Sequence, residues 1–519
     1  MRLSHTLSRT SAVFDDPNLV SHGGLVPVMA LAVRAGLPEL LEGHVRPGGE
    51  CGVNAYLKVG CLVAGMAAGA DSIDDMGLLR HGAMDVLFGG VRAPSTLGSH
   101  LRCYAWGNVL QIEKAGRELL ARLPALAPLL PGADVLAFVD IDSTQKRVYG
   151  HKKEGARFGH TKIQGKSVLV RGLNALIGAV STPLAAPVIA ATRPPGGNAS
   201  SARGAASLAA RAIGTARACG ATGTIVVRMD SAYYTAAVIA AVRRNEARFS
   251  VTAPVSAAIR AAITTIPQDA WQPIEYPQAI WDDQLDCRVS DAEVAGTPYA
   301  AFTSKNKELH VTARLIVRRV RDKATAAPGQ GELFPAWRYH AVFTDSPFEL
   351  IQAEEQHRGH AVIEQLLADL NDGPLAHLPS GKFTANAAIA HNLVRAAGAL
   401  AGRRHARART VTIRRDLIAV AGRTARHGRG RLTIHLPEGW HRAHEWLNLW
   451  EAACGPPSPD PVSTPTPARA HHCKPPRPGT PDKPQNRQRQ GKHAPESSRR
   501  AEWPNPESVG GLRLSSGWQ

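Results

Sequence analysis

Two carboxylates at the end of an apolar run are the residues of this chain best suited to metal chemistry. Residues 136–144 read Leu-Ala-Phe-Val-Asp-Ile-Asp-Ser-Thr, with acids at Asp140 and Asp142. Alternate side chains of a strand point to the same face, so both carboxylates share one face. Neighbouring like charges destabilise a sheet, and a divalent cation with hard oxygen ligands is the usual remedy. The alternative is a strand that ends in an aspartate cap and a Ser-Thr turn.

Composition favours a polyanionic partner. The 519 residues contain 61 Lys and Arg against 43 Asp and Glu, a net charge of +18. Nucleic acid is the obvious partner for such a balance, and the alternative is a basic tail on an otherwise neutral enzyme. Seven scattered cysteines without a Cys-x-x-Cys pair predict reduced thiols and no zinc site. Arg, Pro and Gly interrupt every apolar segment, so we expect a cytoplasmic protein with no membrane partner.

The first 130 residues are predicted to form a helical region. Apolar residues recur at steps of three and four within residues 25–41, 54–68 and 109–123. Residues 93–102 offer a helix cap at Ser95 or Ser99, followed by a helix with Arg102, Tyr104 and Trp106. This helix could be the recognition part of a helix-turn-helix, with Arg102 on DNA. A helical hairpin in a scaffold is the alternative.

Residues 131–250 have an α/β pattern. Strands are expected at residues 135–141, 166–177 and 182–192, then a helix at 199–220 and a strand that ends in Asp230. The basic segment 149–162, which includes Lys162, is predicted to be a loop that contacts phosphate or a solvated hairpin loop. Three antiparallel strands, a helix, a strand and a helix match the order of a ribonuclease-H-like domain.

The remainder is predicted to contain a β-rich insertion at residues 251–345 and the end of the catalytic domain at 346–454. One helix is expected over residues 348–370, and it places His360 and Glu364 on one face. A further helix at 383–400, a closing hairpin from 411–419 and 431–436, and a last helix at 439–453 follow. From residue 455 the Pro- and Arg-rich composition predicts a disordered tail.

Three acids and their flanking residues resemble those of the DDE transposases of bacterial insertion sequences. Asp-Ser-Thr follows the first strand, Arg-x-Asp-Ser-x-Tyr surrounds Asp230, and His-Arg-x-His-Ala-x-x-Glu leads to Glu364. The similarity is to the cut-and-paste group, in which a β domain interrupts the ribonuclease-H-like fold. It implies that Asp142, Asp230 and Glu364 are the catalytic, metal-binding acids, with Asp140 behind them.

This resemblance also implies cofactors, partners and further site residues. Two Mg²⁺ or Mn²⁺ ions would assist strand cleavage and strand transfer at terminal inverted repeats, on a homodimer bound to nucleoid DNA. A tryptophan of the insertion would stack a flipped base, with Trp271 and Trp281 as candidates and core packing as the alternative.

The signature around the third acid departs from the family pattern. His357 stands where a tyrosine is expected, His360 where an arginine is expected, and Asn371 where a lysine is expected, while Arg358 lies six residues before Glu364. These four positions are the expected DNA contacts of this helix. The alternatives are a metal-dependent nuclease of the same fold and a decayed, non-catalytic DNA-binding protein.

Overall fold

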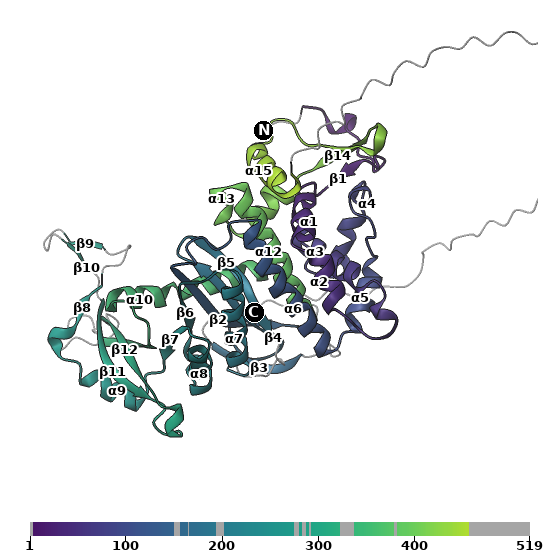
Figure 1. Cartoon of the computed structure of the whole chain (residues 1–519). Coiled ribbons are helices and arrows are strands. Elements are labelled where there is room, and N and C mark those ends of the chain that lie inside the picture. The colour runs from purple at the N-terminus through teal and green to yellow at the C-terminus, as the bar shows by residue number, and fades with distance from the viewer. Residues whose placement is uncertain are drawn as a thin grey trace, which may run out of the picture. The chain divides into compact units, whose positions relative to one another are not determined.

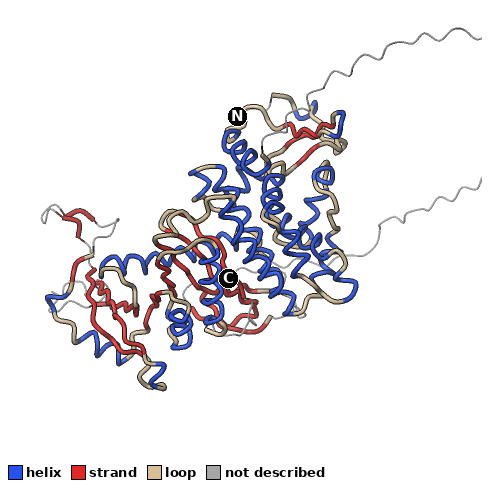
Figure 2. The backbone as a smooth tube through the Cα atoms, in the orientation of Figure 1, coloured by secondary structure: helices blue, strands red, loops and turns tan. Residues whose placement is uncertain are grey.

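The computed structural model describes residues 4–149, 156–163, 166–193, 202–274, 280–282, 287–289, 292–321, 337–377 and 381–455. These residues belong to one compact unit, Met1–Pro457, and are mixed α/β in composition (Figures 1 and 2). The tail predicted from residue 455 lies outside the described residues, apart from Gly455. The predicted α/β class is therefore confirmed for the described part of the chain.

The N-terminal region is helical, as the apolar spacing predicts. Its helices are α1 Leu25–Arg34, α2 Leu37–His44, α3 Ala55–Ala68, α4 Met84–Leu87, α5 Pro94–Arg102 and α6 Trp106–Arg122. One boundary differs, because α5 starts at Pro94 and stops at Arg102, before Tyr104 and Trp106. Proline suits a first helical position, where its missing N–H is not needed. Tyr104 is buried and hydrogen-bonded to His100, with 2.7 Å between Oη and Nε2, so it does not face a nucleic acid.

A large mixed sheet crosses the described residues in the order β3-β4-β2-β6-β7-β13-β12-β11-β8, and β5 also pairs with β4. Its strands are β2 Leu136–Arg147, β3 Arg157–Ile163, β4 Lys166–Thr182, β5 Ala185–Arg193, β6 Thr224–Met229, β7 Arg248–Ala253, β8 Gln272–Pro273, β11 Ala292–Ala301, β12 Val311–Arg321 and β13 Trp337–Thr344. Strands β2, β6 and β7 run parallel, and the β2–β4 and β4–β5 pairs are antiparallel.

Two strands differ from the sequence-based expectation. Strand β2 continues to Arg147, beyond the predicted end at Ile141, because β4 pairs with it as far as Arg147. The segment predicted to be a loop before Lys162 contains β3, which forms a hairpin with β4. The basic residues of this segment do not alternate with apolar ones as in a half-buried strand. Strand β3 lies at the edge of the sheet, where few apolar side chains are needed.

The β-rich insertion extends the same sheet. Strand β13 pairs antiparallel with β7, and β12 and β11 follow outward. The described residues also include α9 Ala257–Thr264 and the short hairpin of β9 Ile280–Asp282 with β10 Cys287–Val289. Hydrogen bonds therefore join the insertion to β7, the strand beside β6.

The last helices differ in detail from the prediction. The single helix expected over residues 348–370 is α10 Leu350–Arg358, a short turn at Gly359–Ala361 and α11 Val362–Asn371. Residues 411–419, expected to be a strand, form α14 Thr410–Ile413 and a π-helical turn, Arg414–Ile418. The closing hairpin is instead β14 Gly422–Arg426 with β15 Leu432–His435, and β1 Leu19–Val20 pairs with β14. The other helices are α7 Ala205–Ala218, α8 Ala236–Arg244, α12 Thr384–Ala401, α13 Arg403–Ala406 and α15 Ala443–Cys454.

Membrane-spanning helices and the state of the cysteines were also subjects of sequence-based expectations. Among the described residues, no helix is long and apolar enough to span a bilayer. Cys61 and Cys219 are free and buried, as predicted, but Cys103 is disulfide-bonded, so the expectation of reduced thiols is wrong for this residue. Spacing could not reveal it, because a disulfide requires two cysteines that meet only in the folded chain.

Helix α12 lies at the centre of the core and contacts α3, α6, α15 and strand β5. Most of its residues are buried, including the polar Asn392. The Asn392 amide pairs with both backbone groups of Ile189, its Oδ1 accepting from N at 2.8 Å and its Nδ2 donating to O at 2.9 Å. This amide satisfies the backbone of β5 where its register with β4 is irregular.

Replacing this amide should destabilise the fold. In Asn392→Leu two buried backbone groups lose their partner, and each unsatisfied group costs about 1–3 kcal/mol. We expect a loss of roughly 2–5 kcal/mol in urea unfolding. The control Asn245→Leu removes one amide bond to the Ala241 carbonyl at the end of a helix and should cost about 1 kcal/mol. Equal losses would show that the β5 contact is unimportant.

Candidate active site

Asp142 and Asp230 lie at the carboxyl ends of two neighbouring parallel strands. Register pairs Asp140 with Arg228 and Ile141 with Met229, so the next residues along are Asp142 and Asp230. Strand β6 ends at Met229, and from there the side chains of β2 become half-exposed. The crevice beyond the carboxyl ends of parallel strands is where α/β sheets bind ligands.

Each aspartate has one oxygen committed to the backbone. Asp142 Oδ1 accepts from the Ser143 N–H at 2.6 Å. Asp230 caps the turn Ser231–Tyr233, its Oδ1 accepting from the Ala232 N–H at 2.9 Å. Asp142 is thus bonded within a strand that continues to Arg147, whereas Asp230 is bonded at the point where the chain leaves β6.

Glu364 approaches from helix α11. It is exposed and lies in the first turn of α11, and this helix contacts β2. A carboxylate in a first turn is favoured by the positive end of the helix dipole. The third acid therefore comes from an element 134 residues beyond Asp230 in sequence.

Asp142 lies close enough to Asp230 and Glu364 for their charges to act on it. Burial raises the pKa of Asp142, the nearby carboxylates of Asp230 and Glu364 raise it further, and the result is about 6. The Ser143 N–H and the His360 imidazole act in the opposite direction. Asp142 is thus held where its negative charge is unfavourable, which is the environment in which a bound cation is stabilising.

Asp140, two residues earlier on the same strand, is in the opposite situation. It is completely buried, and Arg228 on β6 binds both of its oxygens, with Nε at 2.8 Å and Nη2 at 2.7 Å. His360 Nδ1 donates to Asp140 Oδ1 at 2.8 Å. Burial alone would raise the pKa of Asp140, but Arg228 and His360 outweigh it and hold the pKa below its usual value. A protein cation, and not a metal, neutralises this carboxylate.

Arg228 also links the strands to α10, the helix that precedes the one with the third acid. Its Nη1 donates to the Gln356 carbonyl at 2.8 Å, and its guanidinium lies 4.0 Å from the centre of the Phe138 ring. A Cβ on Gly359 would come within 2.6 Å of Nη1. Gly359 therefore permits the close approach of Arg228 at the break between α10 and α11.

His357 strengthens the same junction from the other side. It is buried, and hydrogen bonds join its Nδ1 to Ser250 Oγ at 2.9 Å and its Nε2 to Thr252 Oγ1 at 3.0 Å. Burial, with help from His360 and Arg228, lowers the pKa of His357 to about 3. A neutral, fully bonded imidazole cannot reach DNA, so the contact predicted for His357 is replaced by a link between α10 and β7.

The donor types suit a hard divalent cation, but the side chains are not assembled around one. Among the described residues, no three His, Cys, Asp or Glu side chains are arranged to hold a metal ion. The backbone N–H groups of Ser143 and Ala232 each engage one oxygen, Oδ1, of Asp142 and Asp230. Side-chain rotation of Glu364, which is exposed, would be needed to complete a set of ligands.

The other predicted contacts occupy different environments. Arg358 Nε donates to both oxygens of Glu354, at 3.0 and 2.8 Å. Glu354 is buried and also pairs with Arg318 at 3.4 Å. Asn371 is the last residue of α11 and half-buried, and its Oδ1 has no hydrogen-bond partner among the described residues.

Two predicted contacts come from outside this helix. Arg102 is exposed at the end of α5, where its Nη2 donates to Ser99 Oγ at 2.9 Å. The backbone of Lys162 lies in β3 opposite Ser167. Its side chain lies outside the described residues.

Trp271, one of the two tryptophans expected to stack a base, packs against an arginine. The Arg319 guanidinium stacks between the rings of Trp271 and Trp337, at 4.1 and 4.4 Å from their centres. These residues line a pocket of about 680 Å³ together with Tyr339. Trp271 is thus half-buried against a cation and has contact with a cavity. The backbone of Trp281 lies in β9, and its side chain is outside the described residues.

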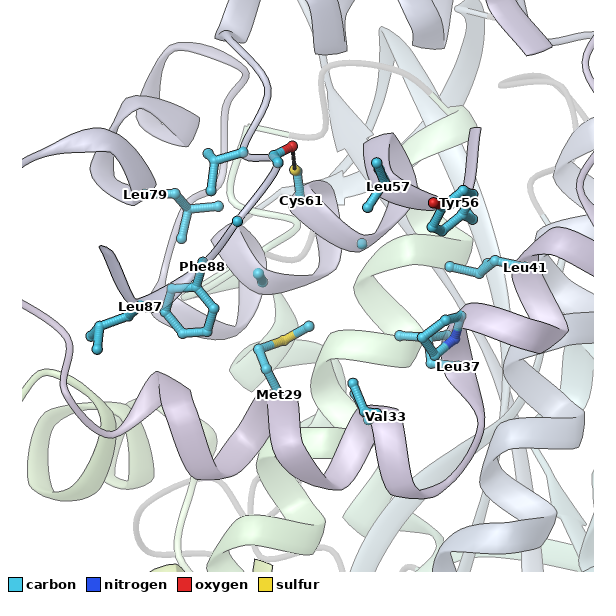
Figure 3. A pocket seen from close by; sticks show the side chains of 17 residues that line it. Met29, Val33, Leu37, Leu41, Tyr56, Leu57, Cys61, Leu79, Leu87 and Phe88 are labelled. Atoms are coloured by element: carbon cyan, nitrogen blue, oxygen red, sulfur yellow. Dashed lines mark hydrogen bonds between the residues drawn. The ribbon is translucent and has the colours of Figure 1, made fainter. Parts of the chain in front are cut away.

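A second pocket, in the N-terminal region, has no catalytic character. It has a volume of about 290 Å³, and apolar side chains of α1, α2, α3 and the segment 87–91 line it (Figure 3). Cys61 lies on its wall, and burial raises the pKa of this thiol. None of the three acids borders this pocket.

Sequence reasoning did not select Arg228 as a site residue. A signal was present, since Arg228 precedes Asp230 by two residues as Asp140 precedes Asp142. On adjacent parallel strands with aligned acids, these two positions must also be aligned and lie on the same face. A cation in one and an anion in the other therefore predicts a cross-strand pair.

The raised pKa of Asp142 predicts a characteristic pH dependence without metal. The pKa of Asp142 is 3.8 in the unfolded chain and about 6 in the folded chain. The free energy of unfolding therefore falls as the pH rises from about 4 to about 6, because the unfolded chain loses the Asp142 proton first. Asp142→Asn should raise the free energy of unfolding at pH 7 by at most about 3 kcal/mol. This gain should vanish near pH 4 in denaturant titrations with a chelator. Added Mg²⁺ should stabilise the parent and not the variant.

Asp140→Asn is the matched control for that experiment. Its pKa is lowered in the folded state, so its charge contributes stability above pH 4 that is lost as pH falls. This variant should be less stable than the parent at pH 7. A loss of stability in both variants would contradict the different environments assigned to the two carboxylates.

Breaking the Arg228–Asp140 pair should be more damaging than removing it. Arg228→Met leaves a buried carboxylate without its main partner, and such losses cost about 3–5 kcal/mol. The double variant Arg228→Met/Asp140→Leu should regain most of this stability, because replacing a buried ion pair by apolar residues is often neutral. Urea unfolding of the four proteins in the cycle gives the coupling. Additive losses would show that the two side chains act independently.

The arrangement of the acids can be set beside that of known protein families. Acids on two parallel strands and on a facing helix, in this order, agree with the family expected from the sequence. No curated protein matches the chain. A family model described as "Transposase DDE domain group 1" matches residues 6–452. This match covers nearly all of the sequence, and the chain belongs to the DDE transposase family.

Proposed function

We propose that this transposase cuts DNA strands at the ends of an insertion sequence and joins them to target DNA, with Mg²⁺ or Mn²⁺ as cofactor. The observation that carries the proposal is the mutual influence of Asp142, Asp230 and Glu364, which come from two parallel strands and a facing helix. Carboxylates from three elements that meet at one end of the sheet are what a two-metal phosphodiester site requires.

Strand order supports a ribonuclease-H-like catalytic domain. Strands β2, β4 and β5 are consecutive and antiparallel, and β6 and β7 then add in parallel beside β2. Helices α7 and α8 follow β5 and β6, as that fold requires. The first acid thus lies on the central strand and the second at the end of its parallel neighbour.

Each acid has a distinct part in the proposed site. Asp142, Asp230 and Glu364 would hold the metal ions, and the metals would stabilise charge on the attacking and leaving oxygens. Asp140 and Arg228 position the ligands and would not touch the substrate. His360, fixed through Nδ1 by Asp140, has its Nε2 available to donate a charge-assisted bond to a phosphate when protonated.

DNA contacts around the acids would come from α11 and its surroundings. Asn371 lies seven residues beyond Glu364 and so on the same face of the helix. It can donate a hydrogen bond to phosphate through its amide. Arg358 would contribute only if DNA competes with Glu354 for its guanidinium. The aromatic pocket at Trp271 offers rings and guanidinium groups that suit an unpaired base.

Substitution of the three acids tests the proposal. Asp142→Asn, Asp230→Asn and Glu364→Gln should each lower Mg²⁺-dependent cleavage of a duplex carrying the element's end by about 10³-fold or more, equivalent to about 4 kcal/mol. Binding of the same duplex should change little. Glu355→Gln is the control, because Glu355 is an exposed acid on α10.

Two outcomes would limit the proposal. A variant of the three that cuts normally would remove that residue from the site. Products with free 3′ ends but no joining to a supplied target duplex would identify a nuclease of the same fold.

A further inference from the structure

A basic hairpin near the end of the described residues is not part of the proposed catalytic site. Strands β14 and β15 pair from Arg423 with His435 to Arg426 with Leu432. The turn between them reads His-Gly-Arg-Gly-Arg, residues 427–431, and all five residues are exposed. We call residues 422–435 the arginine arm.

The segment that contains this arm is rich in arginine. Residues 401–435 contain ten arginines and a single acid, Asp416. Asp416 is buried and already pairs with Arg415 at 2.8 Å and with His405 at 3.3 Å. Its charge is therefore committed away from the arm. Arg423 is engaged by Asp16, whereas Arg426 and Arg429 are exposed. Exposed arginines gathered on one feature are the electrostatic footprint of a nucleic-acid contact.

The tip of the arm holds an arginine in a strained backbone conformation. Arg429 has φ 62° and ψ 27°, in the left-handed region that favours glycine or asparagine. The His427 N–H closes the turn on the Arg431 carbonyl at 2.8 Å. A Cβ on Gly428 or Gly430 would meet no atom within 4 Å, so the tip projects into open space. An unfavourable conformation with no packing benefit suggests a functional side chain.

The base of the arm is fixed to the N-terminal segment. Strand β14 pairs with β1 (Figure 1), and the Thr424 N–H donates to the Asn18 carbonyl at 2.8 Å. Arg423 Nε donates to Asp16 at 3.1 Å. These three strands form a sheet separate from the one that carries Asp142 and Asp230. The arm is thus a supported two-stranded ribbon, outside the catalytic sheet.

We infer that the arginine arm binds the phosphate backbone of duplex DNA at the element's end, at a place distinct from the cleavage site. A two-stranded ribbon fits the major groove, and arginines at its tip can reach the phosphates on either side. The inference rests on the proposed function for the identity of the DNA, but binding and cutting belong to different sheets and can be measured separately.

The first test uses charge removal in the full chain. Arg426→Gln/Arg429→Gln should weaken binding of an end-bearing duplex roughly tenfold or more at about 0.1 M salt, and should make the slope of log K against log salt shallower by about 1.8, at about 0.9 per phosphate contact. Mg²⁺-dependent cleavage at saturating DNA should be unchanged. The control Arg243→Gln/Arg244→Gln removes the same charge from the exposed end of α8 and should leave the slope within error of the parent's.

The second test separates DNA contact from folding. Arg429→Gly relieves the left-handed strain, so it should leave the midpoint of unfolding unchanged or raised while weakening duplex binding severalfold. A structural role would instead lower stability and binding together.

Three outcomes overturn the inference: unchanged binding in both arm variants, an equal loss in the α8 control, or a loss of binding to single-stranded RNA of the same length as large as the loss for duplex DNA. If the parent binds the duplex through the arm but cuts no DNA, the arm stands and the proposed catalytic function fails.

Discussion

The buried pair of Arg228 and Asp140 is the interaction on which the geometry of the candidate site depends. One guanidinium binds a carboxylate on the central strand and a carbonyl of the helix that leads to Glu364. Removing two charges from water is costly, and the pair is sustained by four hydrogen bonds when that from His360 is included. Such a pair contributes little net stability compared with apolar packing, but it allows very few arrangements. It therefore specifies how helix and sheet meet, which a purely apolar contact would leave adjustable.

The same strand face shows how a protein separates structural from functional carboxylates. Asp140 and Asp142 are two residues apart, yet the pKa of the first is lowered and that of the second is raised. The difference arises because β6 supplies a cation beside Asp140 and an acid, Asp230, beside Asp142. The negative charge is therefore unfavourable at Asp142 in the folded chain, whereas its partners stabilise the charge of Asp140. Glycine at position 359 and the neutral, buried His357 maintain this asymmetry by holding α10 close to the sheet.

Arginines near the acids and arginines on the arginine arm lie in different environments. Arginines near the acids are engaged by protein carboxylates, as Arg228 is by Asp140 and Arg358 by Glu354. Arg426 and Arg429 are instead exposed on the arginine arm, in a different sheet. A catalytic centre filled with arginines would compete with metal ions for the same carboxylates. DNA-binding charge on the arm, as inferred above, would avoid that competition, because it lies outside the candidate site.

The sequence by itself determined the class of fold, the order of the main elements around the acids and the family, because apolar periodicity and Asp-Ser turns are local properties. Only the tertiary structure decided that β2 continues past Asp142, that the insertion extends the catalytic sheet, and that residues 411–419 are helical. Pairing partners distant in the chain stabilise or exclude these elements, and a single sequence does not show the partners. The role of Arg228, the burial of His357 and the engagement of Arg358 by Glu354 were likewise decided by the fold. Asp140 lies 88 residues from Arg228, Ser250 lies 107 residues from His357, and Glu354 lies one helical turn before Arg358. Charge and spacing nominate such residues, but the fold determines whether each side chain faces a substrate or a partner within the protein.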